Sequence, residues 1–233
     1  MIKATELSKT FNPRQHTEVK AVESVSISIE PGEIVLIIGP SGSGKTTLLT
    51  MLGGLLSPSA GEIFIADQPI SKLSQGQLTM LRRGKIGFIF QSFNLLDNLT
   101  AFENVVIAGF GKNRNTKRAL ELLNRLGLQN RLHAKPKELS GGERQRVAVA
   151  RSLINNPPII LADEPTANLD SKNGHSVMLL LCEIACQEHK SVVIVSHDQR
   201  LRDIATRVVT IEDGKLTNEA IGDHAKFCPH HNH

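Results

Sequence analysis

The sequence predicts an α/β fold in which crossover helices cover a mostly parallel sheet, with an antiparallel β subdomain beside it and a helical subdomain inserted into it. Short runs rich in Val and Ile alternate with longer segments of helical spacing, which is the pattern of strand–helix–strand units. Several of these runs are too continuous to alternate between two faces, so they predict strands buried on both sides. The first part of the chain carries strands with little helix, whereas the middle is almost entirely helical in pattern.

The predicted elements follow one another in a simple order. The early strands, from Ile2 to about Ile65, are expected to form the antiparallel sheet, and residues 92–156 the inserted helical subdomain. We expect one domain over residues 1–222, followed by a tail of different composition over residues 223–233. The expected strands are 24–30, 33–39, 61–66, 86–90, 157–163, 191–197 and 207–215, and the expected helices are 44–56, 116–128, 141–154 and 174–188.

Composition narrows the class of protein. Of the 233 residues, 40% are hydrophobic and 21% charged, which is ordinary for a packed globular chain. No apolar stretch reaches the roughly 18 residues of a membrane span, and the start MIKATELSK lacks the apolar core of a secretion signal, so the chain is expected to stay in the cytoplasm. The net charge of +4 is mild and no basic block is present, so nucleic acid is not an expected partner.

A glycine-rich stretch, GPSGSGKTT, lies between a predicted buried strand and a predicted helix. It contains Gly39-x-x-x-x-Gly44-Lys45-Thr46, the phosphate-binding P-loop pattern, in the strand-to-helix context that this pattern requires. Lys45 is expected to reach the β- and γ-phosphates, and the Thr46 hydroxyl to hold Mg²⁺. The stretch predicts a P-loop NTPase core with these nucleotide-binding residues: Gly39, Ser41, Gly42, Ser43, Gly44, Lys45, Thr46 and Thr47.

Two carboxylates, Asp163 and Glu164, follow the apolar run IILA at the carboxyl end of a predicted strand. Ligands gather at that edge of an open parallel sheet. Asp163 is expected in the Mg²⁺ shell, and Glu164 is placed to orient or deprotonate an attacking water. A helix-capping aspartate is the alternative, which the P-loop makes the weaker one.

A third motif, LSGGERQR, precedes a predicted helix. Ser140 and Glu143 fit a capping box, in which the two residues bond each other's backbone N–H groups. Capping alone does not explain Gly141 and Gly142 between them. They fit a backbone that approaches a phosphate closely at a helix N-terminus.

LSGGE, together with GPSGSGKTT and LADEPTANLD, resembles the ATP-binding subunit of ABC transporters over essentially residues 1–216. The resemblance implies that two copies bind two ATP molecules head to tail, each held by the P-loop of one chain and by Ser140, Gly141, Gly142 and Glu143 of the other. The implied activity is Mg²⁺-dependent ATP hydrolysis coupled to transport, with Glu164 and Lys45 as catalytic residues.

The same resemblance implies roles for four further residues. Gln91 corresponds to the glutamine that touches Mg²⁺ or water and senses the membrane partner, and His197 to the histidine that contacts the γ-phosphate. Asp170 corresponds to an aspartate of the dimer interface. Phe11 is the candidate for the aromatic ring that stacks on adenine, where Tyr is more usual; an ordinary core phenylalanine is its alternative.

A longer stretch, LRRGKIGFIFQSFNLLDNLTAFENV, resembles the ATPases of lipoprotein-releasing, macrolide-export and cell-division systems. This implies an integral membrane permease, with an extracytoplasmic domain, as the partner. It also implies a peripheral location on the cytoplasmic face of the inner or plasma membrane. An amino-acid importer, a soluble ABC ATPase and a small-metabolite kinase stay open as alternatives.

The tail, DHAKFCPHHNH, has residue types that suit Zn²⁺ or Cu⁺. A plain mobile chain end is the alternative. The candidate metal ligands are His224, Cys228, His230, His231 and His233.

Overall fold

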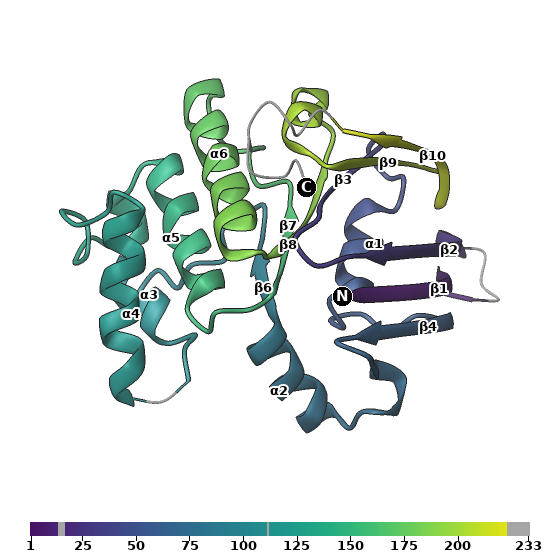
Figure 1. Cartoon of the computed structure of the whole chain (residues 1–233), viewed down its shortest axis with the longest axis horizontal. Coiled ribbons are helices and arrows are strands. Elements are labelled where there is room, and N and C mark those ends of the chain that lie inside the picture. Colours follow the sequence, from purple (N-terminus) through teal and green to yellow (C-terminus); the bar gives the residue numbers. More distant parts are fainter. Residues whose placement is uncertain (14–16, 111, 223–233) are drawn as a thin grey trace.

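The larger of two sheets has six strands in the order β10-β9-β3-β8-β7-β6. The computed structural model describes residues 1–13, 17–110 and 112–222 (Figure 1). Neighbouring strands are parallel except β9 and β10, which form an antiparallel hairpin. Their bounds are β3 (Ile34–Ile38), β6 (Ile86–Ile89), β7 (Ile159–Asp163), β8 (Ser191–Ser196), β9 (Arg207–Glu212) and β10 (Lys215–Ile221).

The smaller sheet is antiparallel, in the order β2-β1-β4-β5. Its strands come from the first part of the chain, as the sequence predicts, and lie on one side of the molecule in Figure 1. Their burial alternates along much of β2 and β4, so this sheet turns one face to the core. The bounds are β1 (Ile2–Phe11), β2 (Val19–Ile29), β4 (Ala60–Ile65) and β5 (Gln68–Pro69).

Helix α1 packs between the two sheets, and α2 lies against β6. On the side opposite the small sheet, α3, α4 and α5 form the helical subdomain, and α6 lies between them and the large sheet (Figure 1). The bounds are α1 (Lys45–Leu52), α2 (Gln75–Lys85), α3 (Ala101–Val106), α4 (Lys112–Arg125), α5 (Gly141–Leu153) and α6 (Ser171–Glu188), with short 3-10 turns η1 (Ile70–Lys72), η2 (Pro136–Glu138) and η3 (Gln199–Ile204).

Strand β3 shows why the apolar runs are continuous. Ile34, Leu36 and Ile38 enter a core shared with α3, α4, α5 and α6. Val35 and Ile37 enter a second core, shared with α1 and the antiparallel sheet. Because both faces of the strand are covered, every position along it is apolar.

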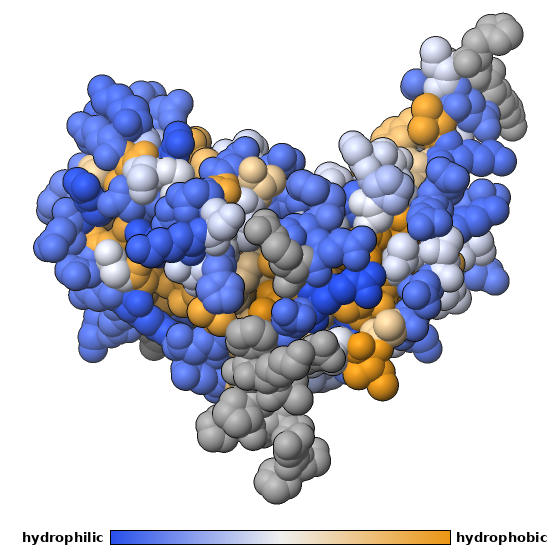
Figure 2. Space-filling view, turned by 90° about the horizontal axis from the view of Figure 1, so that it is seen from above, coloured by the Kyte–Doolittle hydropathy of each residue, from blue (hydrophilic) through white to orange (hydrophobic). Residues whose placement is uncertain are grey.

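Over most of the face seen in Figure 2, hydrophilic side chains are exposed, and hydrophobic ones lie mainly in the recesses between them.

The predicted fold class is confirmed, although helices α2 and α3 and strands β5 and β10 are missing from the expected elements. Helix α3 has six residues and β5 has two, which is too short for a clear apolar period. Helix α2 has two glycines and only two buried residues, Leu78 and Leu81, so its apolar period is weak. Its capping box, Ser74 with Gln77, was the signal available. Strand β10 is an edge strand whose residues are mostly exposed, so it lacks an apolar run.

The predicted boundaries, 92–156 for the subdomain and 1–222 for the domain, stay predictions. The tail over residues 223–233, with its five candidate metal ligands, lies outside the described residues. Within the described part of the chain, no helix combines the length and the apolar character needed to cross a membrane.

Candidate nucleotide-binding site

The glycine-rich stretch Gly39–Thr47 connects the end of β3 to the start of α1, as expected. Gly42 and Gly44 have φ angles of 81° and 100°, which L side chains rarely adopt. A Cβ at Gly39 would lie 2.1 Å from the carbonyl oxygen of Ile211, and one at Gly44 would lie 2.1 Å from that of Ala21. Packing therefore requires glycine at Gly39 and Gly44, and backbone conformation favours it at Gly42 and Gly44.

Lys45 holds the loop in shape from inside. Its side chain is buried, and its Nζ donates to the carbonyl oxygens of Gly39 at 2.9 Å and Pro40 at 2.8 Å. Helix α1 begins after Gly44, which offers no side-chain cap, and its first turn carries no acidic residue. A buried ammonium and the positive end of a helix thus meet at one point, which favours an anion.

Four loops meet at the carboxyl edge of the large sheet. Strands β3, β8, β7 and β6 are neighbours there, so the segments that follow them converge. They enclose a cavity of about 490 Å³, within the size range of small-molecule sites. It is lined by Ala21, Ser41, Gly42, Gly44, Lys45, Thr46, Thr47, Gln91, Glu164 and His197.

Thr46 and Asp163 bring two oxygen atoms together at this edge. The Thr46 hydroxyl donates to Asp163 Oδ1 at 2.9 Å. Burial, together with the nearby charge of Glu164, raises the pKa of Asp163, although the Thr46 hydrogen bond and Lys45 act against that rise. A carboxylate beside a hydroxyl oxygen fits the oxygen ligands that Mg²⁺ prefers. A cation bound there would also stabilise the ionised form of Asp163, which burial disfavours. The residues present therefore fit the magnesium ion that the sequence implies.

Glu164 is held by the end of strand β8. Its carboxylate accepts from Ser196 Oγ at 3.0 Å and from the His197 N–H at 3.1 Å, and lies 2.9 Å from His197 Nδ1. Its side chain is 13% exposed and that of His197 is 68% exposed. Glu164 has a φ of 45°, an uncommon conformation for a residue with a side chain, and such outliers cluster at functional sites. Sequence reasoning placed Glu164 and His197 in one site but missed Ser196, which directly precedes that histidine.

Ser140 forms the capping box of α5. Its Oγ accepts from the Glu143 N–H at 3.2 Å, and the Ser140 N–H donates to Glu143 at 2.8 Å. This bond from Ser140 lowers the pKa of Glu143, and Arg131, at 2.9 Å, adds to the effect. A Cβ at Gly142 would lie 2.8 Å from Asn173 Oδ1, so packing against α6 also requires glycine there.

The remaining predicted residues occupy different places. Gln91 lines the cavity. Asp170 caps α6, accepting from the Asn173 N–H at 2.9 Å. Phe11 is 39% exposed at the end of β1, with Lys9 Nζ 5.4 Å from its ring, which rules out the core alternative. Phe11, Asp170 and Ser140 to Glu143 do not line the cavity, although the structure describes all of them.

The fold and the cavity define a P-loop nucleoside triphosphatase, and comparison with known proteins identifies the family. The family described as ABC transporter matches residues 22–167. The ABC transporter ATP-binding protein MJ0796 of Methanocaldococcus jannaschii is 44% identical, over 94% of this chain and 96% of that protein. The macrolide export ATP-binding/permease protein MacB of Photorhabdus laumondii is 45% identical, over 89% of this chain but only 33% of its own length.

Solved structures agree with this result. The dimeric structure of MJ0796 bound to ADP and Pi has a TM-score of 0.88 and 42% identity, and it covers 95% of this chain and 98% of that one. CbiO1 of Clostridium perfringens, part of the ABC transporter complex cbiONQ, has a TM-score of 0.82 at 28% identity, over 97% of this chain and 89% of that one. The chain belongs to the ABC transporter family, and it is an ATP-binding subunit that hydrolyses ATP with Mg²⁺.

Proposed function

We propose that two copies of this chain close head to tail on two ATP molecules and that closure and hydrolysis drive a membrane permease of the export or mechanotransmission type. The observation that carries the proposal is the composition of the cavity. It gathers the P-loop, Gln91, Glu164 and His197, while Ser140 and its neighbours cap a helix elsewhere in the same chain. A second copy would supply the missing segment.

Within one site the chain's own residues have distinct tasks. Lys45 and the N-terminus of α1 would bind the β- and γ-phosphates, for which Lys45 exchanges its carbonyl partners for phosphate oxygens. Glu164 would accept the proton of the attacking water. Ser196 and His197 hold the Glu164 carboxylate in place for this task. Thr46, Asp163 and Gln91 would hold Mg²⁺, which neutralises phosphate charge when bound. Phe11 would stack on adenine, and Asp170 would lie at the dimer interface.

The proposed permease would dock beside Gln91. A hollow of about 340 Å³ lies there, between the segment after β6 and the helical subdomain, lined by Ser92, Phe93, Leu95, Asp97, Pro136, Lys137 and Arg144. The MacB relatives, which are export ATP-binding/permease proteins by name, support an export permease as the partner. That this partner has an extracytoplasmic domain is part of the proposal. The chain would then sit peripherally on the cytoplasmic face of the membrane.

Replacing the proposed base tests both the chemistry and the dimer. Glu164→Gln is expected to lower ATP hydrolysis by about 10²–10⁴-fold, because general base catalysis typically contributes that much. With hydrolysis blocked, Mg²⁺ and ATP should shift the variant from monomer to dimer. Light scattering is the suitable readout, since the chain has no Trp or Tyr for absorbance at 280 nm.

Glu121→Gln is the matched control, because Glu121 is an exposed residue of α4 whose side chain is 59% exposed. This variant should hydrolyse ATP like the unchanged chain. Normal hydrolysis by Glu164→Gln would rule out Glu164 as the base. If the variant lost hydrolysis but stayed monomeric with ATP, and did so also with membranes present, the head-to-tail dimer would be wrong.

A further inference from the structure

The segment from Glu164 to Asp170 connects the proposed base with the proposed dimer interface. It is a pair of consecutive turns: the Ala167 N–H donates to the Glu164 carbonyl at 3.2 Å, and the Leu169 N–H donates to that of Thr166 at 3.1 Å. The two turns overlap at Thr166 and Ala167, so the segment is compact and hydrogen-bonded along most of its length. Asn168 lies within this segment, four residues after Glu164.

The Asn168 side chain reaches across to the loop that carries Gln91. Its Nδ2 donates to the Gln91 carbonyl oxygen at 2.8 Å, although the two residues are 77 positions apart in the sequence. Both residues are exposed, so this bond is not part of a core. Its removal should therefore change the position of Gln91 more than the stability of the fold.

The other end of the Gln91 loop is fastened to α5. Arg151 donates to the carbonyl oxygen of Phe93 at 2.6 Å and also to that of Asn94. The guanidinium of Arg144 lies 5.2 Å from the centre of the Phe93 ring. The loop is thus held at two points, by arginines of α5 after Gln91 and by Asn168 at Gln91 itself.

Asn168 also touches the helix that begins at the LSGGE motif. A Cβ at Gly141 would lie 3.2 Å from the Asn168 carbonyl oxygen and 3.4 Å from Leu169 Cδ2. The amide of Asn168 therefore contacts one functional loop, while its backbone packs against the start of α5.

We propose that Asn168 is a positioning residue: it fixes Gln91 relative to Glu164 and so sets the geometry in which Mg²⁺ and the attacking water are held. This inference rests on the proposed roles of Gln91 and Glu164. Asn168 bonds to the Gln91 carbonyl rather than to the P-loop, so we expect catalysis to depend on it more than ATP binding does. Loss of the bond lowers kcat and raises the Mg²⁺ concentration needed for half-maximal activity.

Asn168→Asp is the sharpest variant, because it keeps the shape of the side chain and replaces the donor with an acceptor that repels the Gln91 carbonyl. Asn168→Ala removes the donor without adding a charge. One lost hydrogen bond corresponds to about a three- to tenfold change, so we expect kcat to fall by about that factor in Asn168→Ala and further in Asn168→Asp. Asn124→Asp, on an exposed position of α4, is the control for the added charge.

The measurements are kcat, the Mg²⁺ dependence of the rate, ATP binding by equilibrium dialysis, and the thermal midpoint, all on the full chain. The expected result is a lower kcat and a higher Mg²⁺ requirement, with unchanged ATP binding and thermal midpoint. Wild-type kcat and Mg²⁺ dependence in Asn168→Asp would overturn the inference, as would an equal loss of ATP binding or stability. Failure of the proposed function is separate, because it would appear as normal hydrolysis in Glu164→Gln.

Discussion

Asp163 shows how a residue of the site works against the stability of the chain that carries it. Burial raises its pKa, so the carboxylate that Mg²⁺ would need is disfavoured in the folded chain without a cation. The folded state therefore binds a proton at Asp163 more tightly than the unfolded state. The resulting loss of stability sets in as the pH rises through the ordinary aspartate pKa and is complete above the raised one.

We therefore expect Asp163→Asn to stabilise the nucleotide-free chain at neutral pH. The amide removes the disfavoured charge and still accepts the bond from Thr46. For a chain of this size, about 1 kcal/mol corresponds to a rise in the melting temperature of about 2–4 °C. Circular dichroism melts measure the shift.

The same variant should lose the extra stabilisation that Mg²⁺ and ATP give together, because it lacks a proposed magnesium ligand. Below the ordinary aspartate pKa the difference between the two nucleotide-free chains should vanish, since both are then uncharged at position 163. A nucleotide-free Asp163→Asn chain that melts lower than the unchanged chain at neutral pH would contradict this account.

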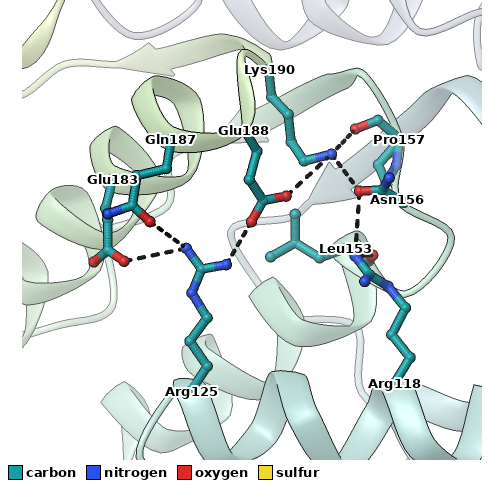
Figure 3. A network of polar contacts seen from close by, with 9 residues as sticks. All are labelled: Arg118, Arg125, Leu153, Asn156, Pro157, Glu183, Gln187, Glu188 and Lys190. Atoms are coloured by element: carbon teal, nitrogen blue, oxygen red, sulfur yellow. Dashed lines mark hydrogen bonds and ion pairs between the residues drawn. The ribbon is translucent and has the colours of Figure 1, made fainter. Parts of the chain in front are cut away.

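At the scale of elements, a polar network joins the helical subdomain to the core (Figure 3). Arg125 of α4 pairs with Glu188 at 2.5 Å and with Glu183 at 3.2 Å on α6. Lys190, whose side chain is 4% exposed, donates to Asn156 Oδ1 and to the Pro157 carbonyl, both at 2.8 Å, and lies 3.5 Å from Glu188. Burial lowers the pKa of Lys190, whereas the charge of Glu188 and its hydrogen bond act in the opposite direction and favour the charged form.

We expect Glu188→Gln to destabilise the fold by about 1–3 kcal/mol, because it removes the negative charge that faces both Arg125 and the buried Lys190. Urea unfolding measures the change as a lower midpoint with an unchanged slope. Glu121→Gln is again the control, since its pair with Lys117 spans 4.0 Å between side chains that are 59% and 86% exposed. Equal midpoints for the two variants would mean that the network does not hold the subdomain to the core.

At the scale of the whole molecule, the proposed dimer makes each site from two chains. A chain with Lys45→Ala lacks a working P-loop, and a chain with Ser140→Arg lacks a working LSGGE segment. A dimer of one of each contains one complete site, made from the P-loop of the second chain and the LSGGE segment of the first. Mixing the two inactive chains should therefore restore ATP hydrolysis in part.

This complementation is measured by titrating one variant into the other at constant total concentration. Activity should pass through a maximum near equal amounts. Ser140→Arg also removes a helix cap, which costs about 1 kcal/mol, so its folding is checked by circular dichroism first. A mixture of two folded variants that stays as inactive as its parts would show that the sites are not shared between chains.

Much of the fold was predictable because the elements that carry the site have strong local patterns. The runs before Gly39, Asp163 and His197 are continuous and apolar, since both faces of each strand are buried. Helix α2 and strand β10 were not predicted, because a helix with few buried positions and an exposed edge strand leave weak patterns. The Ser196 and Asn168 contacts were also missed, since a hydrogen bond between distant segments has no sequence period.

The sequence by itself determined that the chain is an ATPase of this family and predicted the residues of its site: a lysine and glycines for phosphate, two carboxylates at a strand end, and a serine at a helix start. Those assignments depend on residues that are neighbours along the chain, so spacing is enough to make them. Only the tertiary structure decided which motifs share a cavity. The order β3-β8-β7-β6 brings Lys45, His197, Glu164 and Gln91 to one edge and leaves Ser140 capping α5 away from it, because packing between elements, rather than spacing along the chain, sets those distances.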